Sequence, residues 1–257
     1  MICPKCKEKL TLINSSYKCK NNHCYDISKE GYVNLLLSKT DAGDNKDLIN
    51  ARINFLNKDY YLPLVNKLSS IIKDLNTKVL LDAGCGTGYY TNYFKQVIDS
   101  VYGSDISKDA IKYASKKNKE ITYFVSSNQF IPLENNSIDT IINIFAPYFE
   151  NEFHRLLKQN GYLIIVHAGE KHLWELKELI YDTPYLNPIT NFDFTKFGLV
   201  NEEILEYKKV IPSDDLNSLF MMTPYYYKTK NNDYSKINTV SSLNLTISFK
   251  ITIFRRK

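Results

Sequence analysis

The feature of this chain that most constrains its fold is a glycine-rich loop between a predicted strand and a predicted helix. Residues 79–81 are an apolar run, and residues 82–88 read Asp-Ala-Gly-Cys-Gly-Thr-Gly. Alternate glycines allow a tight turn and let a ligand approach the main chain closely. A second predicted strand, Ser100–Ser104, leads into Asp105, whose carboxylate can accept hydrogen bonds from both hydroxyls of a ribose. The sequence therefore predicts a nucleoside-binding site at the ends of two strands.

The spacing within this loop favours one class of nucleoside ligand. Dinucleotide-binding loops read Gly-x-Gly-x-x-Gly, and their third glycine packs the helix under a pyrophosphate. Here Asp82 stands before the glycines, where its carboxylate suits the amino group of a cationic ligand without phosphate. We therefore predict S-adenosylmethionine, with an ordinary strand-to-helix turn as the alternative, and expect Cys85 to be a small packed residue. The candidate cofactor-binding residues from this pattern are Asp82, Gly84, Gly86, Thr87, Gly88, Asp105 and Asn128.

Segments of strand and helix character alternate along the body of the chain. Asp47–Leu75 has apolar residues at helical spacing, interrupted near Pro63, and predicts two helices after a polar linker at Thr40–Lys46. Such alternation predicts a doubly wound α/β fold with a parallel sheet that binds ligands at the carboxyl ends of its strands. The other predicted elements are strands at Ile121–Ser126, Ile138–Phe145 and Gly161–His167, a helix at Glu150–Lys158, and late antiparallel strands at Glu206–Pro212 and Leu243–Phe254.

Four of the five cysteines lie within the first 24 residues. Cys3 and Cys6 form one pair of ligands, and a predicted hairpin separates them from a second pair that begins at Cys19, which is the spacing of a zinc ribbon. His23 and Cys24 compete for the fourth place, and the three-residue gap after Cys19 favours His23. A redox role for the Cys-x-x-Cys pair is the weaker alternative, because no βαβ pattern surrounds it.

The positive charge of the chain is concentrated near its N-terminus. The sequence has 33 basic and 28 acidic residues, a net charge of +5, and residues 1–40 have seven lysines against three acidic residues, a net +4. Dense lysines suit contact with a polyanion such as a phosphate backbone, and a lysine-rich solvated surface is the alternative. With no leader-like apolar stretch and no 18-residue apolar run in the sequence, we expect a cytoplasmic protein without a membrane partner.

A second candidate contact for nucleic acid is the segment Ser218–Lys230, which is predicted to be a loop. Its tyrosines and lysines are interleaved, and such residues can stack a base and hold its phosphate. A tyrosine-rich loop without such a role is an equal alternative in a chain with 20 tyrosines.

Several segments of the chain together have the pattern of one family. The zinc pattern is followed by Lys-Glu-Gly-Tyr-Val-Asn-Leu at residues 29–35, and the glycine loop is followed by Tyr-Tyr-Thr at residues 89–91. Further matching segments are Ala51-Arg52, Tyr61-x-Pro63-Leu64, Ala146-Pro147, His172-Leu-x-Glu-Leu-Lys177 and Met222-Thr223-Pro224. Over nearly its whole length the chain thus resembles the RlmA/TlrB-type methyltransferases, which modify N1 of guanine in 23S ribosomal RNA.

The resemblance implies a class I, Rossmann-like S-adenosylmethionine-dependent methyltransferase sheet with an N-terminal zinc ribbon. It implies Zn²⁺ on Cys3, Cys6, Cys19 and His23, and it adds Tyr61 and His172 to the cofactor contacts. The implied division is a zinc-binding RNA-recognition module at 1–36, a linker and helices at 37–76, and the methyltransferase domain at 77–257. The implied partner is a hairpin of 23S ribosomal RNA. Monomer and homodimer both stay open, as do two family branches that modify neighbouring guanines.

The implied reaction moves a methyl group from S-adenosylmethionine to N1 of guanine. N1 lies on the Watson–Crick edge, so the base must be unpaired or flipped out to be reached, and we expect it near Pro147 and Tyr148. N1 carries a proton that must leave, and the sequence identifies no catalytic base. Two other functions stay open: a zinc-ribbon methyltransferase acting on a small molecule or protein, and a nucleic-acid-binding module with an inert cofactor domain.

Overall fold

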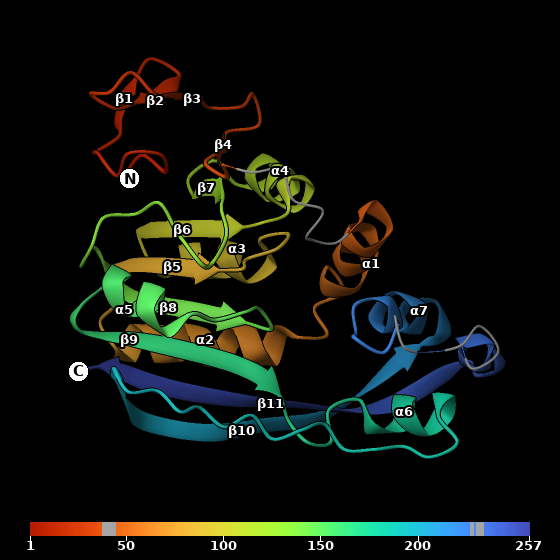
Figure 1. The fold of residues 1–257 in the computed structure, drawn as a ribbon. Helices are drawn as coiled ribbons and strands as arrows, with labels where there is room; N and C mark the ends of the chain where they lie inside the picture. The colour runs from red at the N-terminus through yellow and green to blue at the C-terminus, as the bar shows by residue number, and fades with distance from the viewer. Residues whose placement is uncertain (38–44, 227–228, 230–233) are drawn as a thin grey trace.

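The computed structural model describes residues 1–37, 45–226, 229 and 234–257. A central sheet of eight strands forms the body, and a small three-stranded sheet stands beyond one edge of it (Figure 1). In spatial order the central strands are β10 (Phe197–Pro212), β11 (Ser242–Arg256), β9 (Leu157–Ala168), β8 (Ile138–Ile144), β5 (Val79–Ala83), β6 (Ser100–Asp105), β7 (Thr122–Val125) and β4 (Val33–Asn34). The six strands from β9 to β4 run parallel, whereas β11 and β10 pair antiparallel.

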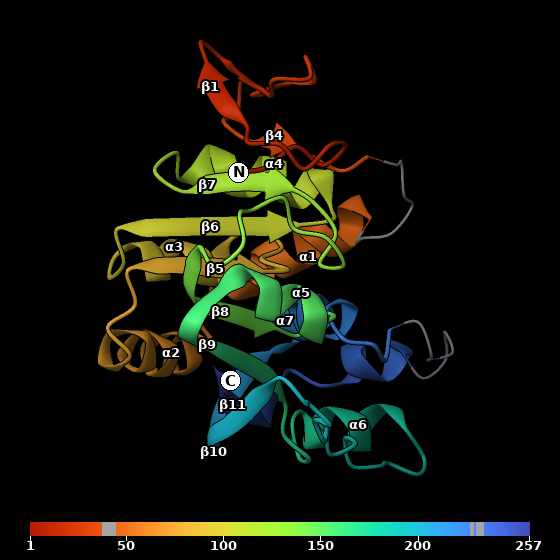
Figure 2. The same ribbon diagram turned by 60° about the vertical axis from the view of Figure 1, so that its left-hand side comes forward.

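Helices cover both faces of this sheet. The helices of the described ranges are α1 (Lys46–Leu56), α2 (Leu62–Asp74), α3 (Tyr89–Lys95), α4 (Lys108–Lys117), α5 (Glu150–Leu156), α6 (Trp174–Ile180), α7 (Ser213–Met221) and the short 3-10 helix η1 (Lys236–Thr239). Helices α2 and α3 lie on one face and α5 on the other (Figures 1 and 2). The strands alternate accordingly, since Leu80 packs in one apolar cluster with Leu68 of α2, and Leu81 packs in another with Phe153 of α5. The predicted doubly wound α/β sheet is confirmed.

Two predicted helices begin where their sequences indicate. Within Asp47–Leu75 the chain forms α1 and α2, and Pro63 lies in the first turn of α2, where a missing backbone N–H costs nothing. The side chain of Asn45 accepts a hydrogen bond from the backbone N–H of Leu48 at 3.0 Å and thereby caps α1. Residues 40–44 of the predicted linker lie outside the described residues, and Lys46 belongs to α1.

Three sequence predictions near the C-terminal half were wrong in their bounds or type. The strand predicted at Glu206–Pro212 begins at Phe197, and its first half was missed because β10 is the edge strand and exposes polar residues on both faces. The predicted loop at Ser218–Lys230 begins within α7, although the acidic residues Asp214 and Asp215 are typical of a first helical turn. Helix α5 ends at Leu156, because Leu157 already begins β9.

The small sheet consists of β1 (Thr11–Ile13), β2 (Ser16–Lys18) and β3 (Cys24–Asp26), all antiparallel. Val33 and Asn34 follow it and pair in parallel with β7, so the last part of the predicted 1–36 module joins the edge of the central sheet. No helix among the described ranges is long and apolar enough to cross a membrane.

Candidate cofactor site and metal centre

The glycine-rich loop lies at the carboxyl end of β5, beside the ends of β8 and β6. Gly84, Gly86 and Gly88 have φ angles of 85°, 53° and 74°, in the left-handed region that favours glycine. A Cβ atom on Gly84 would lie 2.4 Å from Cβ of Ala146, so no side chain fits there. At Gly86 an added Cβ would approach only Cδ of Arg52, at 3.9 Å, so this stretch of main chain is open to a ligand.

Asp105 ends β6 and is tied to the loop. Its Oδ2 accepts a hydrogen bond from the backbone N–H of Gly86 at 2.8 Å, and its Oδ1 accepts one from the backbone N–H of Ser107 at 2.8 Å. A carboxylate has about four acceptor positions, and a vicinal pair of hydroxyls needs two of them. The arrangement fixes the carboxylate next to the open main chain at Gly86.

Asp82 lies beneath the same loop and is almost fully buried. Its Oδ2 accepts a hydrogen bond from the hydroxyl of Thr91 at 2.6 Å. Burial is the main cause that raises the pKa of this carboxyl to about 7, against the lowering effect of the Thr91 bond, and the charge of Asp105 adds to the rise. A ligand cation beside Asp82 would therefore stabilise its ionised form.

A cavity opens between the loop, helix α1 and the end of β8. Five predicted cofactor residues line it: Tyr61, Asp82, Gly84, Gly86 and Thr87. Cys85 also contributes to the lining; it is otherwise buried, and burial raises the pKa of its thiol, as suits a packed residue. Sequence reasoning gave no role to the seven other lining residues, which are Arg52, Leu56, Tyr89, Tyr90, Ile144, Phe145 and Met222. Arg52, Tyr89, Tyr90 and Met222 stood within family-like segments, but only the fold shows that they meet at this cavity.

His172 does not line the cavity and lies behind Tyr61. Its Nδ1 accepts a hydrogen bond from the backbone N–H of Ser248 at 3.1 Å, and its Nε2 is 3.5 Å from the hydroxyl oxygen of Tyr61. Burial lowers the pKa of this imidazole to about 3, so the ring is neutral. With Nδ1 as the acceptor, the proton lies on Nε2 and faces the Tyr61 oxygen. The hydroxyl proton of Tyr61 is thus free to be donated elsewhere.

Asn128 holds the loop that follows β8. Its Nδ2 donates to the carbonyl oxygen of Pro147 at 2.9 Å, and Nδ2 of Asn143 donates to the carbonyl oxygens of Ala83 and Pro147 at 2.9 and 3.3 Å. Asn128 does not line the cavity, and neither does Gly88, which forms the N-terminal cap of α3. These residues fix the loops that shape the site.

Tyr148, expected beside the target base, faces a different part of the molecule. Its ring centroid is 5.3 Å from that of Phe192, 5.5 Å from that of Phe194 and 6.1 Å from that of His167. Tyr148 is absent from the cavity lining. Tyr148 therefore does not contact the cofactor cavity, and the expectation that the target base lies near Pro147 and Tyr148 stays a prediction.

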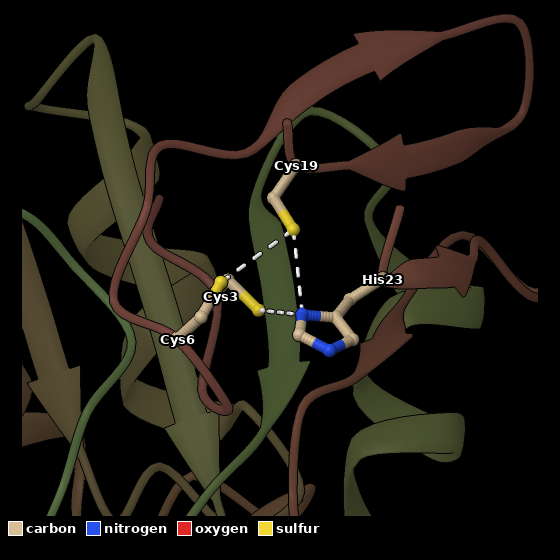
Figure 3. A group of neighbouring side chains, drawn as sticks. All are labelled: Cys3, Cys6, Cys19 and His23. Atoms are coloured by element: carbon tan, nitrogen blue, oxygen red, sulfur yellow. Dashed lines mark hydrogen bonds between the residues drawn. The ribbon is translucent and has the colours of Figure 1, made fainter. Parts of the chain in front are cut away.

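The zinc pattern forms a compact group of four side chains (Figure 3). Ligand atoms of Cys3, Cys6, Cys19 and His23 all lie within 4.8 Å of one another. Sγ of Cys3 is 3.4 Å from Nδ1 of His23, Sγ of Cys19 is 3.5 Å from the same nitrogen, and the Sγ atoms of Cys6 and Cys19 are 3.6 Å apart. A tetrahedral zinc ion with bonds of about 2.0–2.3 Å needs ligand atoms about 3.5–3.8 Å apart. The four side chains fit zinc.

Cys24 lies outside this group. It is exposed, and its Sγ is 3.8 Å from Oδ1 of Asp26. The structure therefore brings His23, and not Cys24, to the fourth position that the sequence left open between them. The Tyr25 hydroxyl lies 3.4 Å from Sγ of Cys3 and can donate a hydrogen bond to its thiolate.

The zinc ribbon contacts the loop that carries Asn128. Nζ of Lys7, next to Cys6, lies 3.2 Å from the ring centroid of Phe130, a cation–π contact. The backbone N–H of Ile2 donates to the carbonyl oxygen of Pro132 at 2.9 Å. Metal centre and cofactor site are thus connected through residues 128–132.

Comparisons with known proteins agree with both sites. Residues 1–39 match the family model "RlmA, N-terminal", a zinc ribbon, and residues 81–165 match the model "Methyltransferase domain". A Bacillus subtilis protein named "Putative 23S rRNA (guanine-N(1)-)-methyltransferase YxjB" is 28% identical over 270 residues, which cover 98% of this chain and 95% of that protein. The "23S rRNA (guanine(748)-N(1))-methyltransferase" of Streptomyces fradiae is 28% identical over 186 residues, 69% of this chain and 66% of that protein.

Solved structures share the fold. One from Anaeromyxobacter dehalogenans, a "Putative Type II Methyltransferase", matches with a TM-score of 0.53 and 17% identity over 74% of this chain and 95% of that one. Fold, cofactor loop and family models together define an S-adenosylmethionine-dependent methyltransferase with a Rossmann-like sheet and an N-terminal zinc ribbon. Within this class the chain is similar to the RlmA-type proteins in its zinc ribbon, and to relatives named as 23S rRNA guanine-N1 methyltransferases along most of its length.

Proposed function

We propose that this protein transfers a methyl group from S-adenosylmethionine to N1 of a guanine in a hairpin of 23S ribosomal RNA. The observation that carries the proposal is the joint presence, in one chain, of an RlmA-type zinc ribbon and a methyltransferase sheet. The relative named for this reaction aligns with the chain almost from end to end.

In this proposal the cofactor lies along the glycine-rich loop. Asp105 would bind the ribose hydroxyls, and Asp82 would face the amino group of the methionine part. Gly86 and Thr87 would present main chain to the ligand, whereas Gly84 and Gly88 shape the loop. Tyr61 would donate its hydroxyl proton into the cavity, and His172 would orient Tyr61 from behind. Asn128 would support the site through Pro147.

The cavity favours catalysis by positioning. When bound, S-adenosylmethionine supplies an electrophilic methyl group, and transfer needs in-line approach of guanine N1. Burial raises the pKa of the phenol groups of Tyr61 and Tyr90, so both stay protonated and serve as hydrogen-bond donors instead of bases. The chain's contribution is to exclude water and to hold the target guanine at the correct angle to the methyl group.

The zinc ribbon suits the RNA backbone. All six lysines at positions 1–37 are exposed, and no ion pair among the described residues involves Lys5, Lys18 or Lys29. In the proposed complex these three would contact phosphates, and zinc on Cys3, Cys6, Cys19 and His23 would hold the ribbon in shape. Each such contact makes RNA affinity fall with added salt.

Primer extension on ribosomal RNA tests the proposed function. Methylation of N1 blocks base pairing, so reverse transcriptase should stop at one guanine in RNA from cells that express the wild-type protein. Cells that express Asp105→Ala serve as the control and should show no stop. If wild-type RNA has no stop, and the purified protein consumes S-adenosylmethionine without RNA, the substrate is a small molecule or protein instead.

A further inference from the structure

Phe145 has an unusual backbone conformation at the entrance to the cofactor cavity. It follows β8 directly and has a φ angle of 53°, which is rare for a bulky residue and costs roughly 1–2 kcal/mol. Its backbone N–H is nevertheless held by the carbonyl oxygen of Val166 at 3.1 Å. Strain of this kind persists only where the surrounding structure enforces it, and it is concentrated at functional sites.

The ring of Phe145 is anchored on one side and open on the other. Its centroid lies 5.9 Å from that of Phe249 and 6.1 Å from that of His172. The residue still exposes 45% of its surface. The three tyrosines that line the same cavity, Tyr61, Tyr89 and Tyr90, are buried or half-buried. Phe145 is thus the exposed aromatic residue of the described cavity lining.

The order of strands separates Phe145 from the ribose end of the site. Asp105 ends β6, on one side of β5, and Phe145 follows β8, on the other side. A nucleoside held by Asp105 therefore lies on the β6 side of the loop. The β8 side, at the border between cavity and solvent, is where a second molecule can approach the cofactor.

We propose that Phe145 is the stacking platform for the target guanine, a positioning residue that the RNA base contacts directly. The inference rests on the proposed function and names the surface that receives the flipped base. A phenyl ring offers a π face and no acid or base, so its part in the reaction is to orient N1 towards the methyl group. Aromatic stacking is worth about 1–3 kcal/mol per base, which also helps to offset the cost of flipping.

The test compares three variants with the wild type on a 23S hairpin transcript. Phe145→Leu removes the π face and keeps an apolar side chain, Phe145→Trp restores a π face, and Tyr148→Leu is the matched control from the same loop. Cofactor affinity is measured by calorimetry without RNA, and kcat and KM are measured with RNA.

We expect Phe145→Leu to keep cofactor affinity within about twofold, which also shows that it folds, and to lose roughly 5- to 150-fold in kcat/KM for RNA. Phe145→Trp should recover most of this loss, and Tyr148→Leu should retain wild-type efficiency. A variant Phe145→Leu that is as active as the wild type overturns the proposal. So does a loss of cofactor affinity that accounts for the whole loss of activity, since Phe145 would then only cover the cofactor. A wild-type protein that methylates no guanine overturns the proposed function, and the role of Phe145 with it.

Discussion

The Nε2 atom of His172 lies 3.5 Å from the hydroxyl oxygen of Tyr61, and both side chains are buried. The Nδ1 atom of the same imidazole accepts from the backbone N–H of Ser248, which joins the loop before α6 to strand β11. The pair therefore connects the cavity wall to the antiparallel end of the sheet. Its geometry requires a neutral imidazole, because a second proton on Nδ1 would face the Ser248 N–H.

This pair predicts that folding stability depends on pH through His172. Burial lowers the pKa of His172 to about 3 in the folded protein, against an unfolded value of about 6.5. Between these values the unfolded chain binds the proton and the folded one does not, so stability falls as pH drops from 6.5 towards 3, by up to about 1.4 kcal/mol per pH unit. Urea unfolding at several pH values gives the free energy of unfolding as a function of pH. This free energy should fall less steeply towards low pH for His172→Gln than for the wild type. Equal pH dependence of the two proteins would contradict the neutral, buried state of His172.

Asp105 should dominate cofactor affinity. Its carboxylate holds the N–H groups of Gly86 and Ser107 and, in the proposed complex, the ribose. Hydrogen bonds to charged groups contribute about 1.5–3 kcal/mol each, so Asp105→Ala should raise the Kd for S-adenosylmethionine at least about tenfold, as measured by calorimetry. Asp109→Ala removes the same charge from an exposed position in the first turn of α4 and should leave the Kd nearly unchanged. Equal effects of the two variants would mean that net charge, and not the ribose contact, is responsible.

Replacing one zinc ligand should separate RNA recognition from cofactor binding. Cys19→Ser removes one of the four grouped ligands, whereas Cys24→Ser changes an exposed thiol outside the group. We expect Cys19→Ser to lose its zinc and to weaken hairpin binding by at least about tenfold, or 1.4 kcal/mol. Cofactor affinity should stay close to the wild-type value, because the cavity is built from α1 and the central sheet. Zinc content by mass spectrometry decides the ligand set, and zinc lost from Cys24→Ser instead would identify the other ligand.

Local sequence patterns were sufficient to predict two parts of this protein: the buried strands of the sheet and the zinc ligands, whose spacing is set by metal coordination. Strand β5 could be predicted because it is apolar on both faces, as at Leu80 and Leu81, whereas the two-residue strand β4 was not predicted. The zinc group could be predicted because two closely spaced pairs of ligands, separated by a hairpin, are the typical arrangement for tetrahedral zinc coordination. His23 was favoured over Cys24 by that spacing alone, and the structure brings His23 into the group.

The cavity wall could not be predicted in the same way. Arg52 lies in α1 and Met222 directly follows α7, far away in the sequence, and only the packing of α1 against α7 brings them to one loop. Phe145 reads as the last apolar residue of a strand, and its left-handed backbone has no local sequence signal. The length of the edge strand β10 was predicted too short, because an exposed strand lacks the regular alternation of apolar and polar residues on which strand prediction depends.

Gly88 provides a prediction about stability that is independent of any ligand. With a φ angle of 74°, it leaves no room for a side chain, since an added Cβ would lie 2.5 Å from the hydroxyl oxygen of Tyr123 and 2.8 Å from Cβ of Ala114. Gly88→Ala should therefore lower the free energy of unfolding by about 2–5 kcal/mol, the sum of backbone strain and overpacking. Gly198→Ala is the control and should change the free energy of unfolding little. Its added Cβ would meet only the end of a flexible side chain, Cε of Lys257, at 3.8 Å.

The hydroxyl of Tyr123 makes this prediction sharper. It is buried and has no hydrogen-bond partner among the described residues, so Tyr123→Phe alone should cost little stability. In the background of Gly88→Ala the same change removes the nearer of the two clashing atoms. The double variant should then be more stable than Gly88→Ala by about 0.5–3 kcal/mol, which a double-mutant cycle from urea unfolding measures. A coupling energy of zero would show that the contact with the Tyr123 hydroxyl does not contribute to the loss of stability in Gly88→Ala. The contact with Cβ of Ala114 in α4 would then determine that loss.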